Sequence, residues 1–231
     1  MGNLLRETPY SEITATLEEL ACHGVTREHL TRLRSDTDYA KRVVECMFEV
    51  ESSIADWREF YREFGITCDF SSLVIPKHCK GFDRLIVVAQ GPTIEQVFQQ
   101  CQERFPCRKY AKRNLDKAVS TNDRDPQNGP YAVWVRDRVE ADKEHKNHSA
   151  YHLEQKHIPS ITLLERFLFE LKYFMETGKH LDIKSVTLCS GSRYIDGHVP
   201  HVCWRADKFC VDWYCPRRAY GDQRAREVVA I

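Results

Sequence analysis

The stretch 160–178, SITLLERFLFELKYFMETG, constrains the fold more than any other part of the sequence. Thr162 and Glu165 have the spacing of a capping box, with Ser160 as a competing N-cap. Gly178 stands where a helix takes a left-handed terminal residue. At about 100° per residue, the large apolar side chains fall in one arc narrower than half of the helical wheel, which predicts an amphipathic core helix. These side chains are Ile161, Leu163, Leu164, Phe167, Leu168, Leu171, Phe174 and Met175.

The polar side of this helix carries two aromatic residues, Phe169 and Tyr173, which lie four residues apart and therefore share one side. Charged residues surround them in the sequence. Such a pair can be covered by a second layer of the same chain, for instance the N-terminal helices, or by a partner protein. We expect the same chain to cover the pair, and we keep Phe169 and Tyr173 as candidate interaction residues.

The composition is that of a soluble globular protein, with 42% hydrophobic and 29% charged residues among 231. A formal net charge of zero gives no global field that would attract nucleic acid or a membrane. No apolar run approaches the roughly 20 residues of a membrane span, and the N-terminus lacks the apolar core of a signal peptide. The ten cysteines form no C-x-x-C pair, so we expect free thiols in a reducing compartment. These features predict a cytoplasmic protein that does not enter a membrane.

The order of the patterns predicts an α+β fold. The first 65 residues contain only helical patterns, in four segments with short connections, which favour antiparallel neighbours. From residue 66 onward, strand-like runs appear between helices. We therefore predict a helical module at 1–65 and an α+β domain at 66–231, in which a mixed or antiparallel sheet packs on the 160–178 helix. A single continuous domain is the alternative.

Near the C-terminus, the runs 199–205 and 209–214 predict a β-hairpin. The side chains that share one parity in either plausible register are predicted to be buried: Val202, Trp204, Phe209, Val211 and Trp213. Three others are predicted to face solvent, a loop or a ligand: His201, Cys203 and Asp212. If the turn is Ala206-Asp207, Cys203 lies directly opposite Cys210.

The segment LKYFMETGKHLD, followed by TLCSGSRYIDGHVPHVCWRADKFCVDWY, resembles the helix-then-hairpin ending of a family of uncharacterised bacterial proteins. YSEITATLEELACHGVTREHLTRLR and DYAKRV resemble the N-terminal helical segment of that family. The resemblance covers about a third to a half of the chain. Because the family has no assigned activity, the resemblance implies a bacterial cytosolic setting and no particular chemistry.

Two clusters contain the ligands that zinc prefers. In the first, His148 and His152 lie four residues apart, close to His145, so two imidazoles could share a metal on one helix face. The second contains His198, His201 and Cys203, together with other cysteines of the hairpin. Neither has the spacing of a complete metal motif, so we predict no cofactor and less than one zinc per chain; zinc is the alternative that these residues leave open.

Two further features bear on binding. The turn at Gly91 to Thr93 follows a buried strand and opens a helix, where backbone N–H groups can hold an anion. A basic run accompanies Tyr110, and we interpret it as a solvated face. It consists of Arg108, Lys109, Lys112, Arg113 and Lys117.

These observations favour a binding or interaction protein over an enzyme, because no complete catalytic constellation is present. Its partner would be another protein or a second copy of the chain. The alternative is a small-molecule enzyme that uses the Gly91–Thr93 turn as its anion site. A further alternative is an accessory protein associated with nucleic acid.

Overall fold

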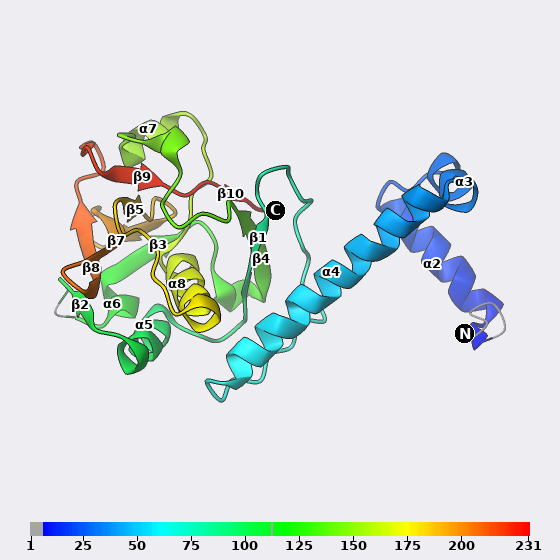
Figure 1. The fold of residues 1–231 in the computed structure, drawn as a ribbon, viewed down its shortest axis with the longest axis horizontal. Helices are drawn as coiled ribbons and strands as arrows, with labels where there is room; N and C mark the ends of the chain where they lie inside the picture. The colour runs from blue at the N-terminus through cyan, green and yellow to red at the C-terminus, as the bar shows by residue number, and fades with distance from the viewer. Residues whose placement is uncertain (1–6, 112) are drawn as a thin grey trace. The chain divides into compact units, whose positions relative to one another are not determined.

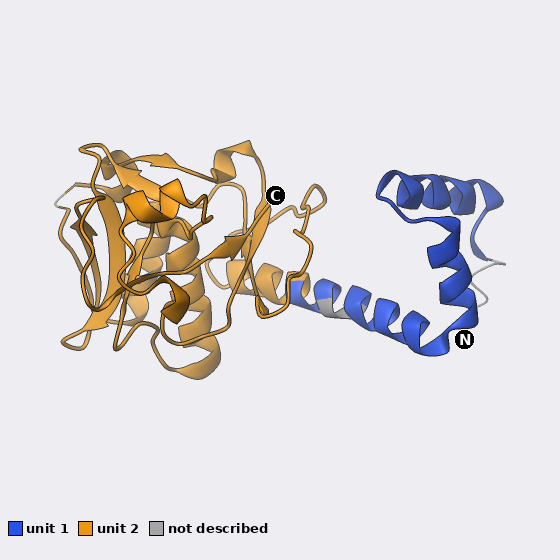
Figure 2. Ribbon diagram, turned by 90° about the horizontal axis from the view of Figure 1, so that it is seen from above, with its two compact units in different colours: residues 1–53 blue, residues 54–231 orange. Residues whose placement is uncertain are grey.

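The computed structural model describes residues 7–111 and 113–231, apart from the side chains of residues 48 and 49. The chain divides into two compact units, 1–53 and 54–231, which Figure 2 shows in blue and orange. The elements form an α+β fold, as predicted, with a helical N-terminal region followed by helices and three sheets (Figure 1). Within the described ranges, no helix combines the length and the apolar character that crossing a membrane requires.

The first unit consists of α2 (Tyr10–Cys22), α3 (Arg27–Ser35) and the first part of α4 (Thr37–Arg62). The two helices predicted at the end of this region are one continuous helix, because the sequence from 37 to 62 contains neither glycine nor proline to interrupt it. Among the described side chains of residues 7–53, none is buried. The described side chains of the first unit therefore form no buried hydrophobic core.

The last turns of α4 belong to the second unit. Trp57 and Tyr61 are buried in the core there, and their polar atoms bond to the first strand of the sheet. The Trp57 indole donates to the carbonyl of Leu85 at 3.2 Å, and the Tyr61 hydroxyl donates to the carbonyl of Val87 at 2.9 Å. The two compact units consequently divide between residues 53 and 54, within α4, because aromatic side chains anchor the end of this helix in the second unit. The division into domains at residue 65 stays a prediction.

The second unit contains three sheets and the helices that pack on them. The antiparallel sheet β1-β4-β10 is made of Arg84–Val88, Tyr131–Val135 and Val228–Val229. The mixed sheet β2-β8-β7-β5-β9 is made of Cys107–Lys109, Lys208–Tyr214, Val199–Arg205, Val186–Leu188 and Gln223–Ala225. A two-stranded pair joins β3 (Val119–Asn122) and β6 (Ser192–Tyr194). The helices are α5 (Ile94–Arg104), α6 (Leu115–Ala118), α7 (Ala150–Gln155) and α8 (Leu163–Thr177), with short 3-10 turns at Pro126–Asn128 and Lys143–His145.

The central helix α8 packs against α5, β1 and β7 (Figure 1). Thr162 is its N-cap and forms the predicted capping box with Glu165, whereas Ser160 lies outside the helix. Gly178 ends the helix in the left-handed region, with φ of 66°. The predicted apolar face is buried over its first half, from Leu163 to Leu171. The two ends encoded in the sequence are thus the ends of the helix.

The opposite side of α8 is also covered by this chain. Phe169 is fully buried, and the guanidinium groups of Arg226 and Arg84 lie 5.1 and 5.7 Å from its ring centroid. Tyr173 is half-buried beside it, with the two ring centroids 6.4 Å apart. The interpretation of Phe169 as part of an exposed partner surface is therefore wrong, because arginine side chains of the same chain cover the ring.

A cluster of four buried charged residues lies on this side of α8. Arg166 donates to Asp182 at 2.8 Å and to Glu170 at 2.9 Å, and Arg226 donates to the other oxygen of Asp182 at 2.8 Å. Thr187 and the backbone N–H of Ala141 also donate to Asp182. Burial alone would raise the pKa of Asp182, but the charges of Arg226 and Arg166 hold it below its usual value. Two cations and two carboxylates thus balance one another inside the core.

The C-terminal hairpin has the Ala206-Asp207 turn, and both residues have positive φ, as a two-residue hairpin turn requires. In this register Cys203 opposes Cys210, and both are free thiols. The predicted face is buried at Val202, Phe209 and Val211, and Trp204 is half-buried.

The prediction that Trp213 is buried is wrong, because 36% of its surface is exposed. It pairs with Pro200 near the end of the hairpin that is distant from the turn. The rings of His198 and Tyr110 lie beside its ring, with centroid distances of 4.0 and 5.9 Å. On the other face, His201 and Cys203 are buried. His201 stacks on Tyr214 at 3.8 Å between ring centroids, so a neighbouring side chain of the hairpin covers it.

Candidate functional site

The turn that was predicted to bind an anion is capped from within the chain. Gly91 has φ of 109°, and Thr93 caps α5 with Gln96 as its capping-box partner. The carboxylate of Asp116 accepts the backbone N–H of Glu95 at 3.1 Å. Because side chains of this protein accept the N–H groups of residues 93, 95 and 96, the structure does not favour an anion site at Gly91 and Thr93.

A depression of about 220 Å³ adjoins this turn. Its charged lining residues are Asp116, Arg124 and Asp125, and Arg124 is already held by Glu165 at 2.7 and 2.9 Å. No histidine or cysteine is among the described residues that line it. The depression therefore does not join Thr93 to a histidine or a cysteine.

The three histidines of the first predicted metal cluster lie close together, with their imidazole rings in a row. The ring centroids of His145 and His148 are 5.7 Å apart, and those of His148 and His152 are 4.4 Å apart. Burial, followed by the nearby charge of His152, lowers the pKa of His148. Glu227 lies 3.1 Å from His145, and this contact directs that imidazole toward the carboxylate.

The second predicted cluster is divided by the sheet. His198 lies against Trp213, whereas His201 and Cys203 face the opposite side of the hairpin. Across 7–111 and 113–231, no three side chains of His, Cys, Asp or Glu are arranged to hold a metal ion. Elemental analysis of the dialysed protein remains the test of the zinc alternative.

The second unit contains an aromatic cleft, which we define by Tyr110, Ala118, Tyr194, Ile195 and Trp213 and whose volume is about 390 Å³. Ala118 and Tyr194 are buried, and Trp213 is partly exposed. Tyr110 and Ile195 stand further out, with 59% and 71% of their surfaces exposed. An apolar concavity with exposed aromatic walls is typical of a binding site.

Strand pairing positions the two outer aromatic rings. The strand β2 pairs in parallel with β8, and the N–H of Tyr110 then donates to the carbonyl of Val211 at 2.9 Å. This places the Tyr110 ring edge-on to Trp213, with the centroids 5.9 Å apart. Opposite them, Ile195 is fixed by its N–H bond to the carbonyl of Ala118. Each wall of the aromatic cleft is therefore held by backbone hydrogen bonds.

Ala111 and two charged side chains, Arg113 and Asp196, also line the aromatic cleft. Asp196 contacts the imidazole of His198 at 3.0 Å. Arg113 has no hydrogen bond or ion pair to any residue that the structure describes, and it is exposed. Burial raises the pKa of Tyr194, so its hydroxyl stays protonated at neutral pH. Among the residues that the structure describes, the cleft thus offers an apolar floor, the outer rings of Tyr110 and Trp213, and one available cation.

Two members of the predicted basic run contact carboxylates of this chain. Lys109 is bound to Glu95 at 2.7 Å, and Arg108 lies 3.8 Å from Asp212. Lys112 lies outside the described residues. Sequence reasoning noted Tyr110 within this run but missed its contact with Trp213, because the parallel pairing of β2 with β8 has no local signal.

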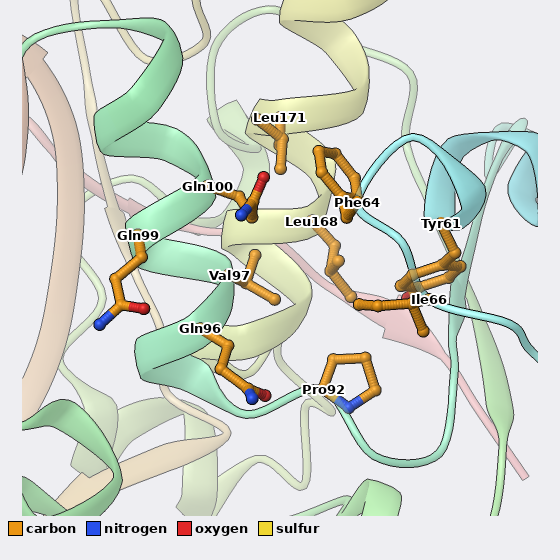
Figure 3. A pocket seen from close by; sticks show the side chains of 10 residues that line it. All are labelled: Tyr61, Phe64, Ile66, Pro92, Gln96, Val97, Gln99, Gln100, Leu168 and Leu171. Carbon is orange, nitrogen blue, oxygen red and sulfur yellow. The ribbon is translucent and has the colours of Figure 1, made fainter.

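A smaller cavity of about 170 Å³ lies between the end of α4, α5 and α8 (Figure 3). Its lining combines apolar residues such as Phe64, Leu168 and Leu171 with Gln96, Gln99 and Gln100. Figure 3 shows the glutamine side chains coming from α5 and the large apolar side chains from the surrounding elements. It contains no charged group among the described residues, so we regard the larger aromatic cleft as the better candidate site.

The fold and this cleft together define an α+β protein with an aromatic cleft in its second unit. No protein-family model matches the chain, and neither a curated protein nor a solved structure shows significant similarity to it. The resemblance to a bacterial family therefore stays a prediction.

The stability of the second unit is expected to fall as the pH falls, because burial lowers the pKa of His201 to about 4. An unfolded histidine titrates near 6.5, so the unfolded state binds the proton first and gains stability between about pH 6.5 and 4. The full effect is about 3 kcal/mol, lost progressively over this window. The measurement is urea unfolding followed by tryptophan fluorescence between pH 7.5 and 4.

The variant His201→Gln should show a shallower pH dependence, because it has no imidazole to protonate. His23→Gln is the matched control, since His23 is an exposed side chain of α2's C-cap in the first unit. If the unfolding free energy of His201→Gln depended on pH as steeply as that of the parent, protonation of His201 would not be the cause of the pH dependence.

Proposed function

We propose that this chain is a cytoplasmic binding protein whose aromatic cleft receives a flat apolar group of its ligand. The observation that carries the proposal is the exposed pair Tyr110 and Trp213 above a buried apolar floor. Aromatic rings bury large areas, and they favour the faces and edges of other planar groups. A cytoplasmic setting is supported by the ten free thiols.

The chemistry of the rim indicates that the ligand also carries a negative charge. Arg113 lines the cleft and has no hydrogen bond or ion pair to any described residue, whereas Asp196 contacts His198. A ligand carboxylate or phosphate beside Arg113 would gain a charge-assisted hydrogen bond. The ligand class is therefore a planar organic anion or an equivalent group on a partner protein.

The other two functions have less support. An enzyme that uses the Gly91–Thr93 turn would need free N–H groups where Asp116 and Gln96 already accept them. A nucleic-acid surface would need several available cations, but Lys109 and Arg108 are directed toward Glu95 and Asp212.

The test is an NMR titration of the full chain with indole-3-acetate, which combines a planar ring with one carboxylate. The indole N–H signal of Trp213 is expected to shift, with a Kd on the order of 1 mM for a ligand of this size. Trp57 and Trp134 are internal controls, because their indole N–H groups donate to Leu85 and Pro76 within the fold.

Two variants separate the parts of the aromatic cleft. Tyr110→Ala should weaken binding of both indole-3-acetate and neutral indole. Arg113→Ala should weaken only indole-3-acetate, by about three- to tenfold for one exposed charge contact. Tyr151→Ala, an exposed tyrosine of α7 outside the cleft, should leave both unchanged. Shifts at Trp57 or Trp134 without a shift at Trp213 would overturn the proposal.

A further inference from the structure

The helix α4 carries an apolar stripe whose members are spaced alternately by three and four residues. The stripe consists of Ala40, Val43, Met47, Val50, Ile54, Trp57 and Tyr61. This is the spacing of the inner positions of a coiled coil. The helix α2 carries a shorter stripe with the same spacing, made of Tyr10, Ile13, Leu17 and Leu20.

Only the C-terminal end of the α4 stripe is fully buried. Trp57 and Tyr61 are buried in the core of the second unit. Two heptads earlier, Met47 has 60% of its surface exposed, and Val43 and Val50 are only half-buried. The pattern that identifies a packed face therefore continues for two heptads beyond the residues that are packed.

Among the side chains that the structure describes in the first unit, none covers these stripes completely. Tyr10, Leu17 and Leu20 on α2 are exposed, as is Leu30 on α3. Burying a large apolar side chain contributes about 1.5–3 kcal/mol of favourable free energy. A complex in which a partner covers both stripes is therefore stabilised by several such contributions. Contiguous apolar faces of this kind mark sites of protein association.

We propose that the occupant is a second copy of this chain, joined through the stripes of α2 and α4. The positions that flank the exposed part of the α4 stripe are Tyr39, Val44, Cys46 and Glu51. In coiled coils, charges at the flanking positions determine which helices pair, and like charges oppose the pairing of two identical helices. Here only Glu51 among the flanking residues is charged. Two identical stripes can therefore meet without a series of like charges.

The charges of α2 and α3 are complementary between copies. Glu12, Glu18 and Glu19 give α2 three acidic residues and no lysine or arginine. In α3, Arg27, Arg32 and Arg34 outnumber the single acid, Glu28. A two-fold arrangement with α2 of one copy beside α3 of the other brings opposite charges together twice, and isologous contacts of this type are the commonest in homo-oligomers.

The test is the molar mass of the full chain by analytical ultracentrifugation over a range of protein concentrations. The parent is expected to be dimeric, and Met47→Glu should raise the dimer dissociation constant by about tenfold or more, because it places a charge without a partner in the interface. Ser52→Glu is the matched control, since this exposed residue of the same helix lies on the side away from the stripe.

Thermal unfolding of each variant, followed by the fluorescence of the tryptophans in the second unit, distinguishes loss of the dimer from loss of the fold. Met47 is exposed in the single chain, so Met47→Glu should leave this transition in place. A monomeric parent at high micromolar concentration would overturn the proposal. A dimer that survives Met47→Glu unchanged would also overturn it, because the interface would then lie elsewhere.

Discussion

Replacing Asp182 by alanine is expected to lower the free energy of unfolding by about 3–5 kcal/mol, the usual cost of removing one partner from a buried ion pair. The carboxylate accepts hydrogen bonds from Arg166 and Arg226, and all three side chains are buried. Without it, Glu170 would be left to balance two guanidinium groups, although it contacts only Arg166 of the two. Urea unfolding at pH 7 measures the loss.

The control for this prediction is Asp207→Ala. Asp207 and Asp182 both have φ of 56°, so alanine meets the same left-handed backbone at either position. Asp207 is exposed in the hairpin turn, and it has no buried cation to leave unpaired. Asp182→Asn is the second variant, because it keeps the shape and removes the charge. If Asp182→Ala and Asp207→Ala cost the same, backbone strain and not the buried charge would explain the loss.

Phe167→Ala is expected to cost about 3–5 kcal/mol, because it leaves a cavity in the middle of the core. The Phe167 ring is fully buried on α8, with the rings of Phe98 and Phe209 each 5.6 Å from its centroid. It therefore joins α5, α8 and the mixed sheet. Denaturant midpoints of the parent and the variant give the difference, provided that the denaturant slope is unchanged.

Tyr173→Ala is the comparison within the same helix. Tyr173 is half-buried near the end of α8, so its removal should cost clearly less than that of Phe167. Equal midpoints for Phe167→Ala and the parent would mean that α8 is peripheral to the fold, against its position in the structure.

The sequence predicts α8 and the hairpin well because their signals are local. Thr162, Glu165 and Gly178 define the helix ends within a few residues, and strand parity determines which hairpin residues share a face. The same reasoning does not show which part of α4 is packed, since only tertiary contacts distinguish Trp57 at the end of α4 from Met47 in its exposed part.

The aromatic cleft and the buried charges could not be predicted in this way. Tyr110 and Trp213 meet only because β2 pairs in parallel with β8. The charged cluster joins Arg166 and Glu170 on α8 to Asp182 and Arg226 from later segments. In the sequence, Arg166 and Glu170 have the spacing of an ordinary surface pair, and nothing local shows that the rest of the fold encloses them.

The balanced cluster has a consequence for how this chain can change during evolution. Losing one member strands an opposite charge in the core, whereas replacing the whole group by apolar residues of similar volume is often tolerated. The effects of mutations at Arg166, Glu170, Asp182 and Arg226 should therefore be strongly epistatic. We expect related sequences to keep all four residues or to have exchanged them together, since each single step between the two solutions passes through a destabilised protein.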